Sequence, residues 1–86
     1  MHTVEMLQHA VDLAGRLGYE IRHEWLDGVP GGAVELGGRK IVFLDLAMGP
    51  IDQLDQVLDA IRREPRAAEL PMPFQLQDLL GVRKSA

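Results

Sequence analysis

Nucleophilic side chains are almost missing from this sequence. It contains no cysteine, and its only hydroxyl residues besides Tyr19 are Thr3 and Ser85, near the two ends. The lack of thiols excludes a disulfide framework, a thiolate zinc site and a thiol nucleophile. A hydroxyl nucleophile must be held rigidly beside its base, which positions near chain ends do not favour. The sequence therefore leaves enzymatic activity open but favours a protein that is not an enzyme.

Aromatic residues and long apolar runs are also scarce. The four aromatics are Tyr19, Trp25, Phe43 and Phe74, too few and too dispersed for a base-stacking platform. No apolar run approaches the ~20 residues that a membrane-spanning helix needs. The first residues lack the basic and apolar regions of a secretory signal. We therefore expect a cytoplasmic protein that does not enter a membrane.

Positive charge is in deficit. The chain has 9 basic and 13 acidic residues and a net charge of −4. Such a domain has no general attraction for phosphate backbones or anionic membranes. The pairs Arg39-Lys40 and Arg62-Arg63 are candidates for a local basic patch, but each is only a pair. We expect no nucleic-acid partner.

The length of 86 residues predicts a single domain over residues 1–86. The hydrophobic fraction of 47% is typical of a globular protein, and the apolar periodicity predicts the α+β class. A repeat of three and four from Val4 through Leu7 and Val11 indicates an amphipathic helix, and alternation after Tyr19 indicates a half-buried strand. The expected elements are helices over 3–17, 50–63 and 74–80, and strands over 19–26, 33–36 and 40–46.

The third expected strand is apolar on both faces. Gly37-Gly38 predicts a tight hairpin before it, because both central positions of the favoured turn need positive φ. The simplest arrangement is a three-stranded antiparallel meander with the two long helices on one face and a short C-terminal helix.

Association follows from that arrangement. Ile41 and Phe43 point to one side of the third strand, and Val42, Leu44 and Leu46 to the other. Helices cover only one side, so an exposed row of Val42, Leu44 and Leu46 is the expected interface. We expect a second copy to cover it, making the protein a non-enzymatic interaction module that forms a homodimer or joins a larger complex. The alternative cover is the C-terminal segment around Phe74.

A small-ligand or metal-binding domain is the alternative function. His23 and Trp25 share the apolar side of the first strand, near the turn from Gly28 to Gly32, and are the candidate ligand-binding residues. A row of His2, Glu5, His9 and Asp12 follows one helix face, but it lacks the spacing of a metal motif. We interpret that row as a solvated face and expect no metal ion, no cofactor and no catalytic residue.

The whole chain resembles a set of small uncharacterised bacterial proteins. The resemblance rests on Gly31-Gly32 followed by Ala33-Val34, on the hairpin from Leu36 to Lys40, and on the apolar strand that ends at Asp45. The helix from Pro50 and the proline-containing stretch before the last helix, Leu70 to Leu80, complete it. Many such sequences carry cysteine where this one has Val34. The resemblance supports the fold and implies no activity.

Overall fold

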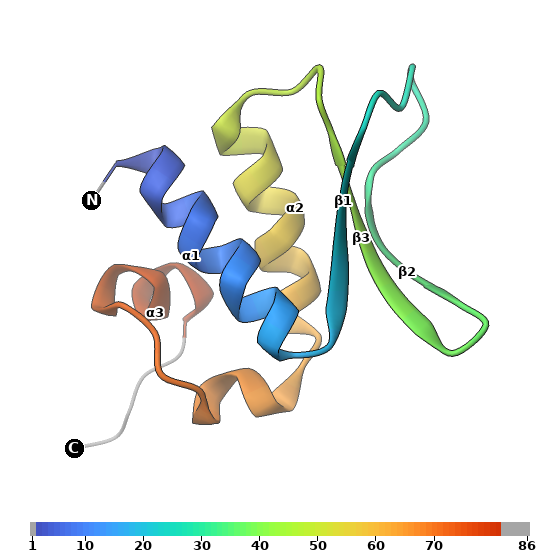
Figure 1. The fold of residues 1–86 in the computed structure, drawn as a ribbon. Coiled ribbons are helices and arrows are strands. Elements are labelled where there is room, and N and C mark those ends of the chain that lie inside the picture. The colour runs from blue at the N-terminus through green and yellow to red at the C-terminus, as the bar shows by residue number, and fades with distance from the viewer. Residues whose placement is uncertain (1, 82–86) are drawn as a thin grey trace.

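The computed structural model describes residues 2–81 and has the expected α+β class (Figure 1). Its helices are α1 (Thr3–Arg16), α2 (Pro50–Arg62), the short 3-10 helix η1 (Pro65–Glu69) and α3 (Phe74–Leu80). Its strands are β1 (Tyr19–Glu24), β2 (Gly32–Leu36) and β3 (Arg39–Asp45). The predicted helices and strands are therefore confirmed to within a few residues, while η1 was not predicted.

The sheet is mixed, so the predicted antiparallel meander is wrong. Its strand order is β1-β3-β2, with β1 parallel to β3 and β2 antiparallel to β3. The segment 25–31 crosses from the end of β1 to the start of β2, and β3 then returns between them. The physical reason is the composition of β3. A strand that is apolar on both faces is best buried at the centre of a sheet, with the more polar strands at its edges.

Helices α1 and α2 cover one face of the sheet (Figure 1). Val42 and Leu44 point toward these helices and are 0% exposed, within the main hydrophobic cluster. The expectation that they form an exposed row outside the helices is therefore wrong. Leu46 follows the end of β3 and is 41% exposed. Burial of the other two residues removes the reason for a second copy on this face.

Up to residue 81, the C-terminal segment packs against the helices and not against the sheet. In Figure 1, α3 lies on the side of α1 and α2 that faces away from the strands. Leu76 of α3 and Ala67 of η1 are buried in the same cluster as Val42 and Leu44. The alternative in which the segment around Phe74 covers the third strand is thus also wrong, and Phe74 itself is 69% exposed.

Helix α1 is rotated relative to the stripe that its sequence predicts. Its buried residues are Met6, Ala10, Leu13 and Ala14. Val4 is 52% exposed, and Leu7 and Val11 are only half-buried. The apolar band of α1 is therefore wider than the area that the sheet and the other helices bury.

The hairpin between β2 and β3 offers a first prediction. Gly37 and Gly38 have φ of 57° and 80°, in the left-handed region that favours glycine. Gly38→Val should lower the free energy of unfolding by about 1 kcal/mol or more, since a β-branched residue is strained there. Urea denaturation measures this loss. Gly38→Asn is the control and should lose less, because asparagine tolerates positive φ. Equal losses for both variants would contradict the explanation.

Candidate functional site

On the sheet face opposite the helices, the chain's own charged side chains cover the central strand β3. Ile41, at the centre of this face, is only 4% exposed. Glu20, its neighbour on β1, forms an ion pair with Arg39. The Arg22 guanidinium lies 5.9 Å from the centre of the Phe43 ring. Charged groups thus cover the apolar side chains of β3, as long arginine side chains do when their stems pack on apolar surface.

Arg22 also belongs to a row of charges along β1. Its Nε lies 3.0 Å from a carboxylate oxygen of Glu24 and 3.9 Å from one of Glu20. Side chains at the edge of a sheet that carry charge hinder uncontrolled pairing with other chains. The β1 side of this face is therefore both covered and charged.

The β2 side of the same face is apolar and exposed. Val34 lies opposite Ile41 and is 38% exposed, and Leu36 is 58% exposed. Within residues 2–81, β2 pairs only with β3, so its outer backbone groups have no strand partner. An edge strand with exposed apolar side chains is a site for pairing with another strand. We call Gly32–Leu36 with its outward side chains the β2 edge.

A cluster of polar side chains lies beside the β2 edge, on the helix-covered face. Tyr19, Lys40 and Glu35 form one row across the three strands, and Arg63 and Glu64 follow the end of α2. Lys40 Nζ donates a hydrogen bond of 2.7 Å to Glu64 Oε1 and lies 5.0 Å from the centre of the Tyr19 ring. We call these five residues the polar corner. A cleft of about 360 Å³ lies beside it, lined by Tyr19, Ala33, Val34, Glu35, Arg63 and Glu64.

Within the polar corner, Lys40 and Glu64 form an ion pair, while Glu35 and Arg63 do not take part in one among residues 2–81. The hydrogen bond from Lys40 lowers the pKa of Glu64, and the same bond raises the pKa of Lys40. Burial, then the neighbouring Glu64 carboxylate, raises the pKa of the Tyr19 hydroxyl. By contrast, Glu35 and Arg63 are exposed, and neither forms an ion pair with any other residue between 2 and 81. The corner therefore joins α2 to the sheet and leaves one acidic and one basic group available.

The lowered pKa of Glu64 predicts a loss of stability in acid. A carboxylate whose pKa is lower in the folded state stabilises the fold above its ordinary pKa, and this contribution disappears as the pH falls through the folded value. The melting temperature of the wild type should therefore fall between about pH 5 and pH 3, and Glu64→Gln should reduce that fall. Thermal denaturation across pH measures it. Glu69→Gln, which changes an exposed carboxylate of η1, is the control and should behave as the wild type.

The two residues predicted to bind a ligand are not brought together. His23 lies on the helix-covered face of β1 and lines a groove of about 430 Å³ with Val4, Leu7, Gln8, Val11 and Asp12. Trp25 follows the end of β1, is 72% exposed and does not line this groove, and neither does the turn from Gly28 to Gly32. Of the two predicted ligand-binding residues, His23 therefore lines a groove and Trp25 does not.

Metal binding finds no support in the arrangement of side chains. Glu5, His9 and Asp12 of the predicted row are all exposed on α1. Among residues 2–81, no group of three or more histidine, aspartate or glutamate side chains is placed to hold a metal ion.

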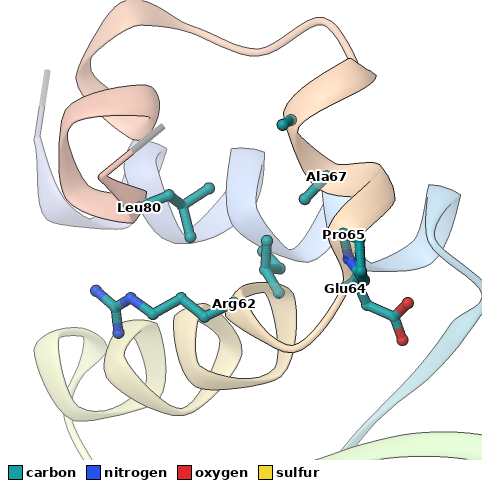
Figure 2. Close-up of a pocket in the computed structure, with 7 residues that line it drawn as sticks. Arg62, Glu64, Pro65, Ala67 and Leu80 are labelled. Atoms are coloured by element: carbon teal, nitrogen blue, oxygen red, sulfur yellow. The ribbon is translucent and has the colours of Figure 1, made fainter. Parts of the chain in front are cut away.

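A smaller pocket of about 210 Å³ lies between the end of α2, η1 and α3 (Figure 2). Leu80 and Ala67 contribute apolar surface to it. The Glu64 carboxylate points away from the pocket in Figure 2, while Arg62 donates a hydrogen bond of 2.8 Å to the carbonyl oxygen of Leu79. This pocket is thus a seam between packed helices, with its arginine already engaged.

The sequence did not reveal the β2 edge or the polar corner. Lys40 and Glu64 are 24 positions apart, so no local spacing joins them. The exposed Val34 and Leu36 alternate with Ala33 and Glu35, which indicated a strand but not its place at an edge.

Comparison with known proteins gives no assignment. No protein-family model matches the chain, and no curated protein or solved structure matches it either. None of the helices within residues 2–81 has the length and apolar character to cross a membrane.

Proposed function

We propose that the protein is a non-enzymatic interaction module that forms a homodimer by pairing the β2 edges of two copies. The observation that carries the proposal is the exposure of Val34 and Leu36 on an unpaired edge strand. Both faces of β3 are closed within one chain, so the edge is the apolar part of the sheet that remains to be covered. Dimers with two-fold symmetry are the commonest form of soluble homo-oligomer.

A two-fold axis through Val34 gives the longest overlap of this strand. The two strands then run antiparallel, with Val34 facing Val34 and Gly32 facing Leu36 of the second copy. Antiparallel strands pair through main-chain hydrogen bonds, and their opposite side chains contact each other. The result is one continuous sheet across both copies, with all long helices on the same face.

Charge on the helix-covered face supports the same register. Ala33 faces Glu35 of the second copy in this arrangement. Ala33 also lines the cleft that contains Arg63. Glu35 of each copy is thereby placed near Arg63 of the other, and both are exposed groups without an ion pair among residues 2–81. The contact is self-complementary, as a two-fold interface requires.

The first test is the mass of the protein in solution. Sedimentation velocity across concentrations should show a dimer for the wild type and a monomer for Val34→Lys, because two like charges would face each other on the axis. Val29→Lys is the matched control, since Val29 is 63% exposed in the loop before β2, and should remain dimeric. Circular dichroism checks that each variant is folded. A wild type that stays monomeric at millimolar concentration would end the proposal.

A charge exchange tests the register. Glu35→Arg and Arg63→Glu should each weaken the homodimer, because like charges then meet across the axis at both symmetric contacts. An equimolar mixture of the two variants should form a heterodimer, since every contact then joins opposite charges. An ion pair within one chain would not produce this rescue. Failure of the mixture to associate would exclude the register centred on Val34.

A further inference from the structure

The β1 edge, at the other side of the sheet, is also unpaired within residues 2–81. It differs from the β2 edge because an apolar groove follows it on the helix-covered side. Val4, Leu7 and Val11 of α1 form one wall of the groove, and His23 of β1 lies at the other. These three residues belong to the part of the apolar band of α1 that the core leaves uncovered, with Val4 52% exposed.

We propose that β1 and this groove bind an extended segment of another protein, which adds to the sheet as a further strand. Strand addition at an exposed edge gains affinity from main-chain hydrogen bonds, and pockets for alternate side chains give specificity. The structure offers both elements at β1. The site is separate from the β2 edge, because β3 lies between the two strands.

The alternation of β1 specifies the chemistry of the added segment. Ile21 and His23 face the helices, and His23 lines the groove. The two residues opposite Ile21 and His23 lie on the same side as the groove and are expected to be apolar. Glu20, Arg22 and Glu24 face the other side, where Arg22 pairs with both glutamates and Glu20 also pairs with Arg39. A charged partner strand would exchange or extend these exposed ion pairs. Residues opposite these three are expected to be basic, acidic and basic, because opposite charges in directly facing positions are favourable. The expected pattern is Lys-Val-Glu-Val-Lys, which reads the same in both directions.

A second copy of β1 does not satisfy this pattern. Antiparallel pairing centred on Arg22 would place Arg22 against Arg22 and Glu20 against Glu24 of the other copy. Like charges in facing positions are unfavourable. The β1 edge therefore discriminates against this self-pairing while remaining open to a segment with complementary charges, and attraction combined with repulsion is how specific interfaces select partners.

The experiment titrates the ¹⁵N-labelled protein with a synthetic capped peptide that carries Lys-Val-Glu-Val-Lys between Gly-Ser flanks. We expect amide shifts along β1 and in α1 near Leu7, slowed hydrogen exchange in β1, and a dissociation constant below a millimolar. A peptide of the same length with the charges reversed, Glu-Val-Lys-Val-Glu, should bind at least tenfold more weakly. Equal binding of the two peptides, shifts confined to β2, or no shift at millimolar peptide would each overturn the proposal.

Two variants separate this site from the dimer contact. Val4→Asp places a charge at the mouth of the groove and should abolish peptide binding while preserving the fold, since Val4 is half exposed. Val34→Lys should bind the peptide as well as the wild type even where it is monomeric. Retention of binding by Val4→Asp, or its loss in folded Val34→Lys, would contradict the assignment to β1.

Discussion

Leu44→Ala is expected to lower the free energy of unfolding by about 2–5 kcal/mol, the usual cost of emptying a buried leucine site. Leu44 is 0% exposed near the C-terminal end of β3, where it packs beneath the helices with Val42. Truncation removes buried apolar area and leaves a cavity that a well-packed core refills only in part. Urea denaturation with a linear extrapolation measures the loss.

Leu46→Ala provides the matched control. Leu46 is two residues further along the chain and 41% exposed, so its truncation should change stability much less than that of Leu44. The comparison tests whether Leu44, and not Leu46, is the buried leucine of this segment. A larger loss for Leu46→Ala than for Leu44→Ala would contradict the burial of Leu44.

Gly31→Ala is expected to lower the free energy of unfolding by about 1–3 kcal/mol, as overpacking of a close contact does. A Cβ atom at this position would lie 2.7 Å from the carbonyl oxygen of Phe43 and 2.8 Å from Nε2 of Gln56. The first neighbour is backbone of the central strand and yields only if the crossing segment 25–31 shifts away. Glycine is therefore required at position 31 because the backbone of the segment 25–31 approaches the backbone of β3 closely there.

Gly15→Ala tests the same chemical change without the contact. Gly15 lies inside α1, and a Cβ atom there would meet nothing within 4 Å. Alanine should stabilise this helix by up to about 1 kcal/mol, since glycine has the lower helix propensity. Thermal and urea denaturation of both variants should thus give effects of opposite sign. Stabilisation by Gly31→Ala would mean that the segment 25–31 does not pack against Phe43.

The elements of this fold were predictable because local signals define them. The pair Gly37-Gly38 specifies a hairpin, and the run from Ile41 to Leu44 specifies a strand apolar on both faces. The predicted strand order was wrong because the turn expected over residues 27–32 implied that the strands on either side of it are neighbours in the sheet, whereas β3 lies between them. The same apolar run contained the missing information, since a strand with two apolar faces is better placed at the centre of the sheet than at the edge where a meander leaves it.

The orientation of β3 was harder to predict from sequence. Ile41 and Phe43 are as apolar as Val42 and Leu44, so hydrophobicity does not say which pair meets the helices. The side chains of β1 distinguish the two faces of β3. Arg22 covers Phe43, and Glu20 forms an ion pair with Arg39 beside Ile41, on the face opposite the helices. The alternation of β1 predicted that His23 shares a face with Ile21, and the strand register agrees. The contact of Lys40 with Glu64 was not predicted, because it depends on the end of α2 lying against the sheet.

The insertion of β3 between β1 and β2 also orders the events of folding. The hairpin of β2 and β3 is local in sequence, and hairpins of this kind form within about 1–10 μs. Strand β1 pairs with β3 only after the segment 25–31 and the hairpin have been closed into one loop, which costs chain entropy before any pairing is gained. Substitutions in the hairpin turn should therefore slow refolding. Substitutions on β1 should mainly accelerate unfolding, as expected for a strand that docks late and is the first to detach.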